Sequence, residues 1–206
     1  MPPRIVQAGH PVLRARAEAV EPDAIATKEM QSLVRRMVDT MRRAPGVGLA
    51  APQLGVGLRV IVLEDSNKLM GRLSPGERAL RGRVPWPLTV LFNPELHLVG
   101  DARATFFEGC LSVEGWSALV ERALEVEVGG LDGDGQPVVH RASGWPARIL
   151  QHEVDHLDGA LYVDRMHSRT FGHNDEVSLR WSRRAVSEVE GELAAHAPPP
   201  MRSAKA

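Results

Sequence analysis

The chain has 206 residues, a formal net charge of −1 from 25 basic and 26 acidic residues, and 43% hydrophobic residues. This length is enough for one domain with a substantial core. The balanced charge gives no reason to expect binding to nucleic acid or to a membrane surface. Cys110 is the only cysteine, which excludes an intrachain disulfide and is usual in a reducing compartment.

Targeting signals are not recognisable in the sequence. No apolar run is as long as a membrane span. The first residues resemble neither a signal peptide nor an amphipathic presequence rich in Arg and Ser. We therefore expect a cytoplasmic protein, or an organellar one only if a presequence has been removed. The oligomeric state is left open.

The first half of the chain begins with a predicted helix. Apolar residues recur at helical spacing from Pro22 up to Pro45. The glycine-rich segment Gly46 to Gly55 follows and by itself indicates only a tight loop. Residues 59–63 predict a buried strand, and residues 65–88, which are polar and rich in Gly, Pro and Arg, predict a surface loop.

The second half predicts a sheet followed by helices. Strands are expected over 88–93, 96–99, 121–128 and 138–141, with a break at Asn93–Pro94 and a hairpin turn at Asp132–Gly135. A helix capped by Ser143 should end at Gly159, and residues 161–163 should return to the sheet. Residues 175–195 predict a second helix, and 196–206, with three consecutive prolines, predict a disordered tail.

The segment from Gln151 to His156 carries the strongest chemical signal. His152 and His156 are four residues apart, so on a helix both rings project from one face and can reach one metal ion. Glu153 would flank the ion and could accept and return a proton. The apolar residues of 147–158 indicate that this helix is largely buried. The alternative is a pair of core histidines bonded to neighbouring groups, because buried polar groups need partners.

A third ligand is needed, because catalytic zinc-type sites use three protein ligands and one open position. Cys110, in Glu108–Ser112, is the candidate to test. A single cysteine is often only a small buried hydrophobic residue. Combined with two imidazoles, however, its thiolate would form a ligand set suited to Fe(II) as well as Zn(II).

Three separate segments now resemble the signature motifs of the peptide deformylase family. They are Gly46–Gln53, Glu108–Ser112 and Gln151–Gly159, in the family's order, and the resemblance extends from about Ile5 to Phe171. Residues 143–150 and 166–171 look most like the branch that includes organellar deformylases.

Short strands around one buried helix indicate an α+β fold, and the resemblance implies its arrangement. Antiparallel or mixed sheets would wrap around a central buried helix that carries the His-Glu-x-x-His motif, with one N-terminal and one C-terminal helix. Residues 1–171 would form the catalytic domain, residues 172–195 a helical extension of the same domain, and residues 196–206 the tail.

The activity implied is hydrolysis of the formyl group from the N-terminal formyl-methionine of new polypeptides, which releases formate. Cys110, His152 and His156 would bind one divalent ion, natively Fe(II), with Zn(II), Ni(II) or Co(II) also possible. The side chain of Gln53 and the backbone N–H of Leu111 would stabilise the oxyanion. Glu153 would carry the proton. The partners implied are N-formyl-methionyl nascent peptides, including those at the ribosome exit.

An apolar pocket for the methionine side chain is also implied. By family position, its lining and border would be Val47, Gly48, Phe106, Glu108, Trp145, Arg148 and Ile149. The substrate backbone would pair as an added strand with Gly46–Gly48. Many bacterial members have aliphatic residues in place of Trp145 and Arg148. Because of the bulky indole, the depth of the pocket does not follow from the resemblance.

Two other classes of protein share part of this pattern. A zinc protease could draw its third ligand from Glu188 or Glu190, but Cys110 and the Gly46–Gln53 segment would then have no role. A metal-stabilised binding module normally has four protein ligands, and the sequence offers only three evident ones.

Overall fold

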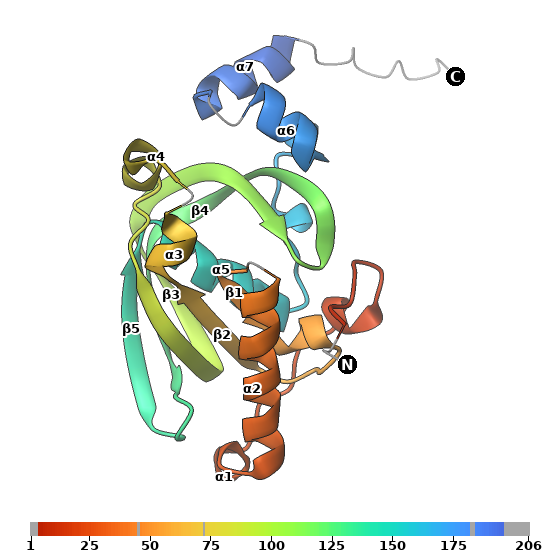
Figure 1. Ribbon diagram of the computed structural model, residues 1–206, viewed down its shortest axis with the longest axis vertical. Helices are drawn as coiled ribbons and strands as arrows, with labels where there is room; N and C mark the ends of the chain where they lie inside the picture. Colours follow the sequence, from red (N-terminus) through yellow and green to blue (C-terminus); the bar gives the residue numbers. More distant parts are fainter. Residues whose placement is uncertain (1–3, 45, 72, 182–183, 196–206) are drawn as a thin grey trace, which may run out of the picture.

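The computed structural model describes residues 4–44, 46–71, 73–181 and 184–195 (Figure 1). The predicted tail, 196–206, lies outside the described residues. Within the described ranges, no helix combines the length and the apolar character needed to cross a membrane.

A six-stranded antiparallel sheet forms the framework, with the order β1-β2-β3-β4-β5 and with β6 paired to β4. Its strands are β1 (Gly48–Ala50), β2 (Val60–Asp65), β3 (Trp86–Cys110), β4 (Val113–Leu131), β5 (Pro137–Ser143) and β6 (Gly172–His173). The sheet curves around the helix α5 (Trp145–Leu157), which lies inside the curve in Figure 1. The expected α+β architecture with a central helix is confirmed.

The side chains of β2 alternate between the two faces of the sheet, and each face packs against a different helix. Ile61 and Leu63 point to the α5 side and join its apolar residues in one core cluster. Val60 and Val62 point to the other side and pack with the helix α2 (Lys28–Arg43). Successive strand residues face opposite sides of a sheet, so a short run of aliphatic residues packs against a helix on each side.

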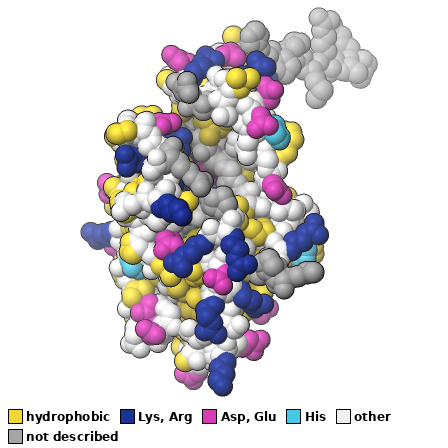
Figure 2. Space-filling view, in the orientation of Figure 1, with side chains coloured by type: hydrophobic (Ala, Val, Ile, Leu, Met, Phe, Trp, Pro, Cys, Tyr) yellow, Lys and Arg dark blue, Asp and Glu magenta, His cyan; other side chains and the backbone are white. Residues whose placement is uncertain are grey.

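The outer face of α2 is polar. Its exposed basic residues are Lys28, Arg35, Arg36, Arg42 and Arg43. Basic side chains gather over this helix in the space-filling view (Figure 2). Apolar residues at helical spacing therefore face the sheet and charged residues face solvent.

The long strand β3 differs from the prediction. The break expected at Asn93–Pro94 is a bulge inside one strand: the register shifts between Phe92 and Glu95, and Asn93 has a φ of +50°. The side chain of Asn93 also holds the N-terminal segment through two 2.8 Å hydrogen bonds to the backbone of Val20. The strand continues past the predicted end at residue 99, and this continuation carries the chain to Cys110.

Two predicted helices are divided, and a predicted loop contains two short helices. The N-terminal one is split into α1 (Pro22–Ile25) and α2 because Thr27 caps the second part. Residues 65–88 form more than a loop: α3 (Asn67–Met70) and α4 (Pro75–Leu80) lie there. The C-terminal helix is split into α6 (Asn174–Arg180) and α7 (Val186–Ala195).

Short 3₁₀ turns join the larger elements. They are η1 (Pro11–Arg14), η2 (Ala51–Leu54), η3 (Tyr162–Asp164) and η4 (Ser168–Thr170). The expectation that residues 161–163 return to the sheet is therefore wrong. The predicted cap, Ser143, belongs to β5, and Gly144 with a φ of +64° precedes α5 instead. Gly159 follows α5 as expected, with a φ of +77°.

Replacing Gly159 by Ala tests the close packing at the end of α5. An added Cβ would lie 2.8 Å from the carbonyl oxygen of Arg14, in a left-handed backbone conformation. We expect a loss of about 2 kcal/mol or more in the free energy of unfolding, measured by urea denaturation. Gly191→Ala is the control: it lies in α7 with open space around its Cβ, and a gain of about 0.5 kcal/mol is expected. Equal effects at the two positions would contradict this explanation.

Candidate metal centre

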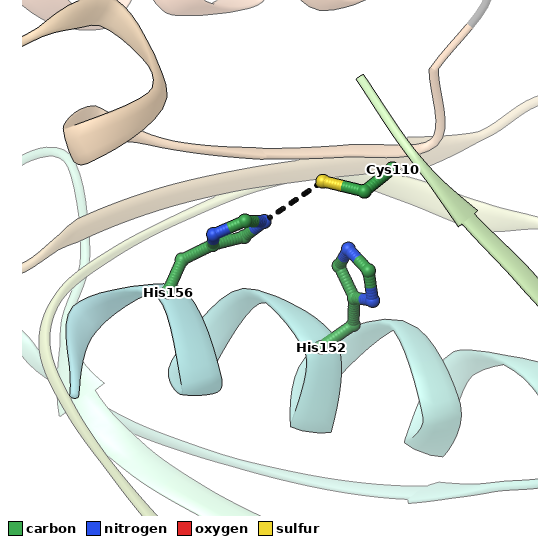
Figure 3. A group of neighbouring side chains, drawn as sticks. All are labelled: Cys110, His152 and His156. Atoms are coloured by element: carbon green, nitrogen blue, oxygen red, sulfur yellow. Dashed lines mark hydrogen bonds between the residues drawn. The ribbon is translucent and has the colours of Figure 1, made fainter. Parts of the chain in front are cut away.

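The end of β3 and two consecutive turns of α5 bring Cys110, His152 and His156 together. Their possible ligand atoms all lie within 4.8 Å of one another. The Sγ atom of Cys110 is 3.2 Å from Nε2 of His156, and the two imidazole rings are 5.1 Å apart between centroids. Figure 3 shows the sulfur and both rings converging above the helix. The three residues that the sequence nominated as ligands therefore form one group.

The chemistry of this group fits one divalent cation. One sulfur and two nitrogens suit Zn(II) or Fe(II), and three protein ligands leave a coordination position open. Burial opposes a positive charge on His152, but its hydrogen bonds with Cys110 and Glu108 outweigh burial and raise the pKa of His152 well above its ordinary value. The surroundings thus favour a positive charge, which a bound cation would supply. Burial lowers the pKa of His156 well below its ordinary value and keeps this ring neutral, as a ligand must be.

Glu153 lies beside the ligands without joining them. Its side chain is buried, with the residue only 4% exposed, and burial raises its pKa to about 7. One carboxylate oxygen, Oε2, has no hydrogen-bond partner among the described residues. Strand β1 passes directly over this group, because a Cβ on Gly48 would lie 2.2 Å from the other oxygen, Oε1. Gly48 thus leaves the space that the carboxylate occupies.

Gln53 reaches the same place from η2. It is 2% exposed, and its Oε1 accepts a 2.9 Å hydrogen bond from the backbone N–H of Ala50. Its amide nitrogen therefore faces the centre, 3.5 Å from Sγ of Cys110 and 3.4 Å from Oγ of Ser112. The Gly46–Gln53 segment, which alone predicted only a loop, positions a hydrogen-bond donor at the sulfur.

The turn after Cys110 is fixed by the N-terminal segment. Nε2 of Gln7 donates a 2.9 Å hydrogen bond to the carbonyl of Leu111, and the backbone N–H of Ala8 donates a 2.7 Å bond to the carbonyl of Ser112. These contacts hold the backbone immediately after Leu111. Sequence reasoning missed Gln7, because nothing in its local pattern links it to residues about one hundred positions away.

Glu108 orients His152. One oxygen, Oε2, is 3.1 Å from Nδ1 of His152, which leaves Nε2 of that ring to face the cation site. The carboxylate also accepts hydrogen bonds from Arg122 at 3.0 and 3.1 Å and from Arg148. Burial opposes its ionisation, but His152 and Arg122 outweigh burial and hold the pKa of Glu108 well below its usual range.

A chain of buried charges continues from this carboxylate towards the surface. Arg122 bonds Asp155 as well as Glu108, and Asp155 accepts two 2.7 Å bonds from Arg165. The sequence analysis missed all three of Arg122, Asp155 and Arg165 as supports of the centre. Arg122 itself was the available signal. It is separated by an even number of residues from the buried Val120 and Val126, so on a strand its side chain faces inward with theirs. A buried Arg requires an acidic partner.

A cleft of about 870 Å³ opens onto the centre. Of the nominated pocket residues, all but one line this cleft: Val47, Gly48, Glu108, Trp145, Arg148 and Ile149. Phe106 is the exception. It packs edge-to-face on Trp145 at 6.3 Å between centroids, so it supports the lining from behind.

A group of one cysteine sulfur and two imidazoles at an open cleft, with a buried acid beside it, is typical of single-metal hydrolases. The family model described as polypeptide deformylase matches residues 2–171. The chain belongs to this family.

Individual relatives support the assignment. The chain is 50% identical to "Peptide deformylase 1A, chloroplastic" of Solanum lycopersicum over 86% of its own length, and it spans 64% of that relative, less than two thirds. It is 48% identical to "Peptide deformylase, mitochondrial" of Homo sapiens, over 81% of this chain and 69% of the relative. These two relatives confirm the expected likeness to organellar deformylases.

A solved structure is similar too. The Acinetobacter baumannii class I type b peptide deformylase with Met-Ala-Ser bound is 34% identical, with a TM-score of 0.69 over 79% of this chain and 96% of that chain.

Replacing Glu108 by Gln should weaken metal binding. The variant keeps the shape of the side chain but removes the charge that orients His152, and loss of such a partner lowers metal affinity by about 10- to 100-fold. Competition with a chelator, followed by metal analysis, measures this effect. Glu125→Gln, on the exposed side of β4, is the matched control and should bind metal as the unchanged chain does. Unchanged affinity in Glu108→Gln would show that the carboxylate does not support the ligand.

Proposed function

We propose that this chain removes the N-formyl group from the N-terminal formyl-methionine of new polypeptides and releases formate. The observation that carries the proposal is the convergence of Cys110, His152 and His156 at the cleft, with Glu153 beside them. Membership of the deformylase family supports the reaction. A solved relative with Met-Ala-Ser bound supports a peptide that begins with methionine as the ligand.

Cys110, His152 and His156 would hold one divalent cation, with Fe(II) as the native ion and Zn(II), Ni(II) or Co(II) as alternatives. When bound, such a cation polarises a carbonyl group and lowers the pKa of water towards neutrality.

Two hydrogen-bond donors would stabilise the oxygen of the formyl group as it gains charge. Gln53 is held by its bond to Ala50, so its amide N–H is fixed towards the centre before substrate arrives. The backbone N–H of Leu111, in the turn that Gln7 fixes, would supply the second donor. Donors held in place in this way need not reorganise during the reaction.

Glu153 would move the proton. It would accept one from the attacking water and deliver it to the amine that leaves as formate forms. Its position supports this role, because it is buried beside the ligands and is pressed under β1 at Gly48.

The peptide would lie extended along β1, the first strand in the order of the sheet. An edge strand has backbone groups available for pairing with an added strand. The methionine side chain would then enter the part of the cleft lined by Val47, Trp145 and Ile149. The protein would act on such substrates as nascent chains at the ribosome exit, in a bacterial cytoplasm or in an organelle.

Formate release from formyl-Met-Ala-Ser by anaerobically prepared protein tests the proposal, with metal analysis of the same sample. We expect formate and Met-Ala-Ser in equal amounts, and no cleavage of the internal peptide bonds. Acetyl-Met-Ala-Ser is the control for the blocking group. Metal-loaded protein that releases no formate, or that cleaves an internal bond instead, would overturn the assignment.

Glu153→Ala should separate chemistry from metal binding. Loss of a positioned acid-base group lowers turnover by about 10²- to 10⁴-fold, whereas metal content should stay near that of the unchanged chain. Cys110→Ala should lower both, because it removes a ligand. Formate assays and metal analysis of both variants make the comparison, and a metal-free Glu153→Ala protein would count against the role given to Glu153.

Gly48→Ala should displace the Glu153 carboxylate, because the new methyl group would occupy its position. Misplacing a reacting group by about 1 Å can cost about 10²-fold in rate, so we expect a fall of that order in kcat/KM with metal content unchanged. Gly57→Ala is the control, since its nearest neighbour is a Val12 methyl at 3.8 Å. Full activity in Gly48→Ala would show that this close approach is unimportant.

A further inference from the structure

The segment between β2 and β3, residues 66–85, lies against the start of α5. The backbone N–H of Trp145 donates a 3.4 Å hydrogen bond to the carbonyl of Gly82. A Cβ on Gly144 would lie only 2.6 Å from the same oxygen. The two chain segments therefore touch backbone to backbone, although more than sixty residues separate them in the sequence.

Arg83 anchors this segment. Its guanidinium makes two hydrogen bonds to Asp65, at 2.6 and 3.0 Å, and the Asp65 side chain is 0% exposed. A two-pronged contact between guanidinium and carboxylate fixes both groups in orientation. The residues on either side of Arg83 are thus tied to the end of β2, while the carbonyl of Gly82 contacts the start of α5.

The Trp145 ring is held by stacking. Its Nε1 is buried and has no hydrogen-bond partner among the described residues. Around the ring lie three guanidinium groups, those of Arg81 at 5.2 Å, Arg83 at 5.6 Å and Arg148 at 5.9 Å from the centroid. The negative face of an indole attracts such cations.

Arg81 differs from the other two arginines. Arg83 is paired with Asp65 and Arg148 with Glu108. The side chain of Arg81 has no ion pair or hydrogen bond to another residue in the described ranges. Burial and the charge of Arg83 lower the pKa of Arg81, against the opposing charge of Glu77. Its main described contact is therefore the ring of Trp145, and that ring lines the cleft.

We propose that Arg81 is a positioning residue that sets the depth of the methionine pocket by holding the Trp145 ring in place. This inference rests on the proposed function, which assigns that part of the cleft to the methionine side chain. With Arg81 in contact, the indole forms a fixed wall that accepts a side chain of methionine length. Without the cation, the ring can turn away and admit a longer chain.

Selectivity between two substrates tests the inference. Formyl-Met-Ala-Ser is compared with the same peptide carrying 2-aminooctanoate, a longer unbranched residue, in place of methionine. In Arg81→Ala, the preference in kcat/KM for the methionine peptide should fall about fivefold, as expected for the loss of one cation–π contact. The change should lie mainly in KM. Arg81→Lys should retain most of the preference.

Three further variants define the cause. Arg81→Met removes the charge but keeps the aliphatic stem, so it should behave as Arg81→Ala does and decides the matter if Arg81→Ala is unfolded. Lys68→Ala removes an exposed cation from the same segment and should change nothing. In a Trp145→Ala background, Arg81→Ala should have no added effect on the preference, because the two residues act as a pair.

A measurement independent of hydrolysis completes the test. With Trp86, Trp116 and Trp181 replaced by Phe, Trp145 is the only indole left. Its fluorescence anisotropy should then decay faster in Arg81→Ala than in the chain that keeps Arg81, because the ring is less restricted. If the unchanged chain releases no formate, the proposed function fails while this decay still decides whether Arg81 holds the ring. An unchanged decay, or an unchanged preference in an active enzyme, overturns the inference.

Discussion

The buried carboxylate of Glu108 is the interaction on which the centre depends. It sits on β3 two residues before Cys110, and it bonds His152 from α5 and Arg122 from β4. A charge in an apolar interior is tolerated only when its partners surround it. The strand, the neighbouring strand and the helix must therefore adopt one relative position. That position also places the sulfur opposite the two rings.

The shape of the sheet follows from the same requirement. α5 carries Arg148, Gln151 and Asp155 on a face that a simple amphipathic helix would expose to water, yet all three are buried. The long hairpin of β3 and β4 covers them and supplies partners: Gln151 bonds the backbone of Ala123, and Asp155 bonds Arg122. The curved sheet thus supplies partners to the polar groups that α5 buries.

Small residues and short segments then adapt this framework to a substrate. Gly48 lets β1 pass over Glu153, and the backbone contact between Gly82 and Gly144 brings two arginines to Trp145. The framework brings Cys110, the two histidines and Glu153 together, whereas the segment outside it shapes the cleft.

The sequence by itself nominated the three candidate ligands and the helix that carries two of them, because the four-residue spacing of His152 and His156 and the uniqueness of Cys110 are local facts. It also determined the strand alternation, the hairpin turn and the stop at Gly159. Only the tertiary structure decided that β3 runs unbroken through Asn93, that Arg122 and Arg165 support the centre, and that Phe106 lies behind the cleft. The reason is physical: these features depend on which partner a residue meets across the fold. Local spacing records the period of a helix or strand, but not the identity of a distant neighbour.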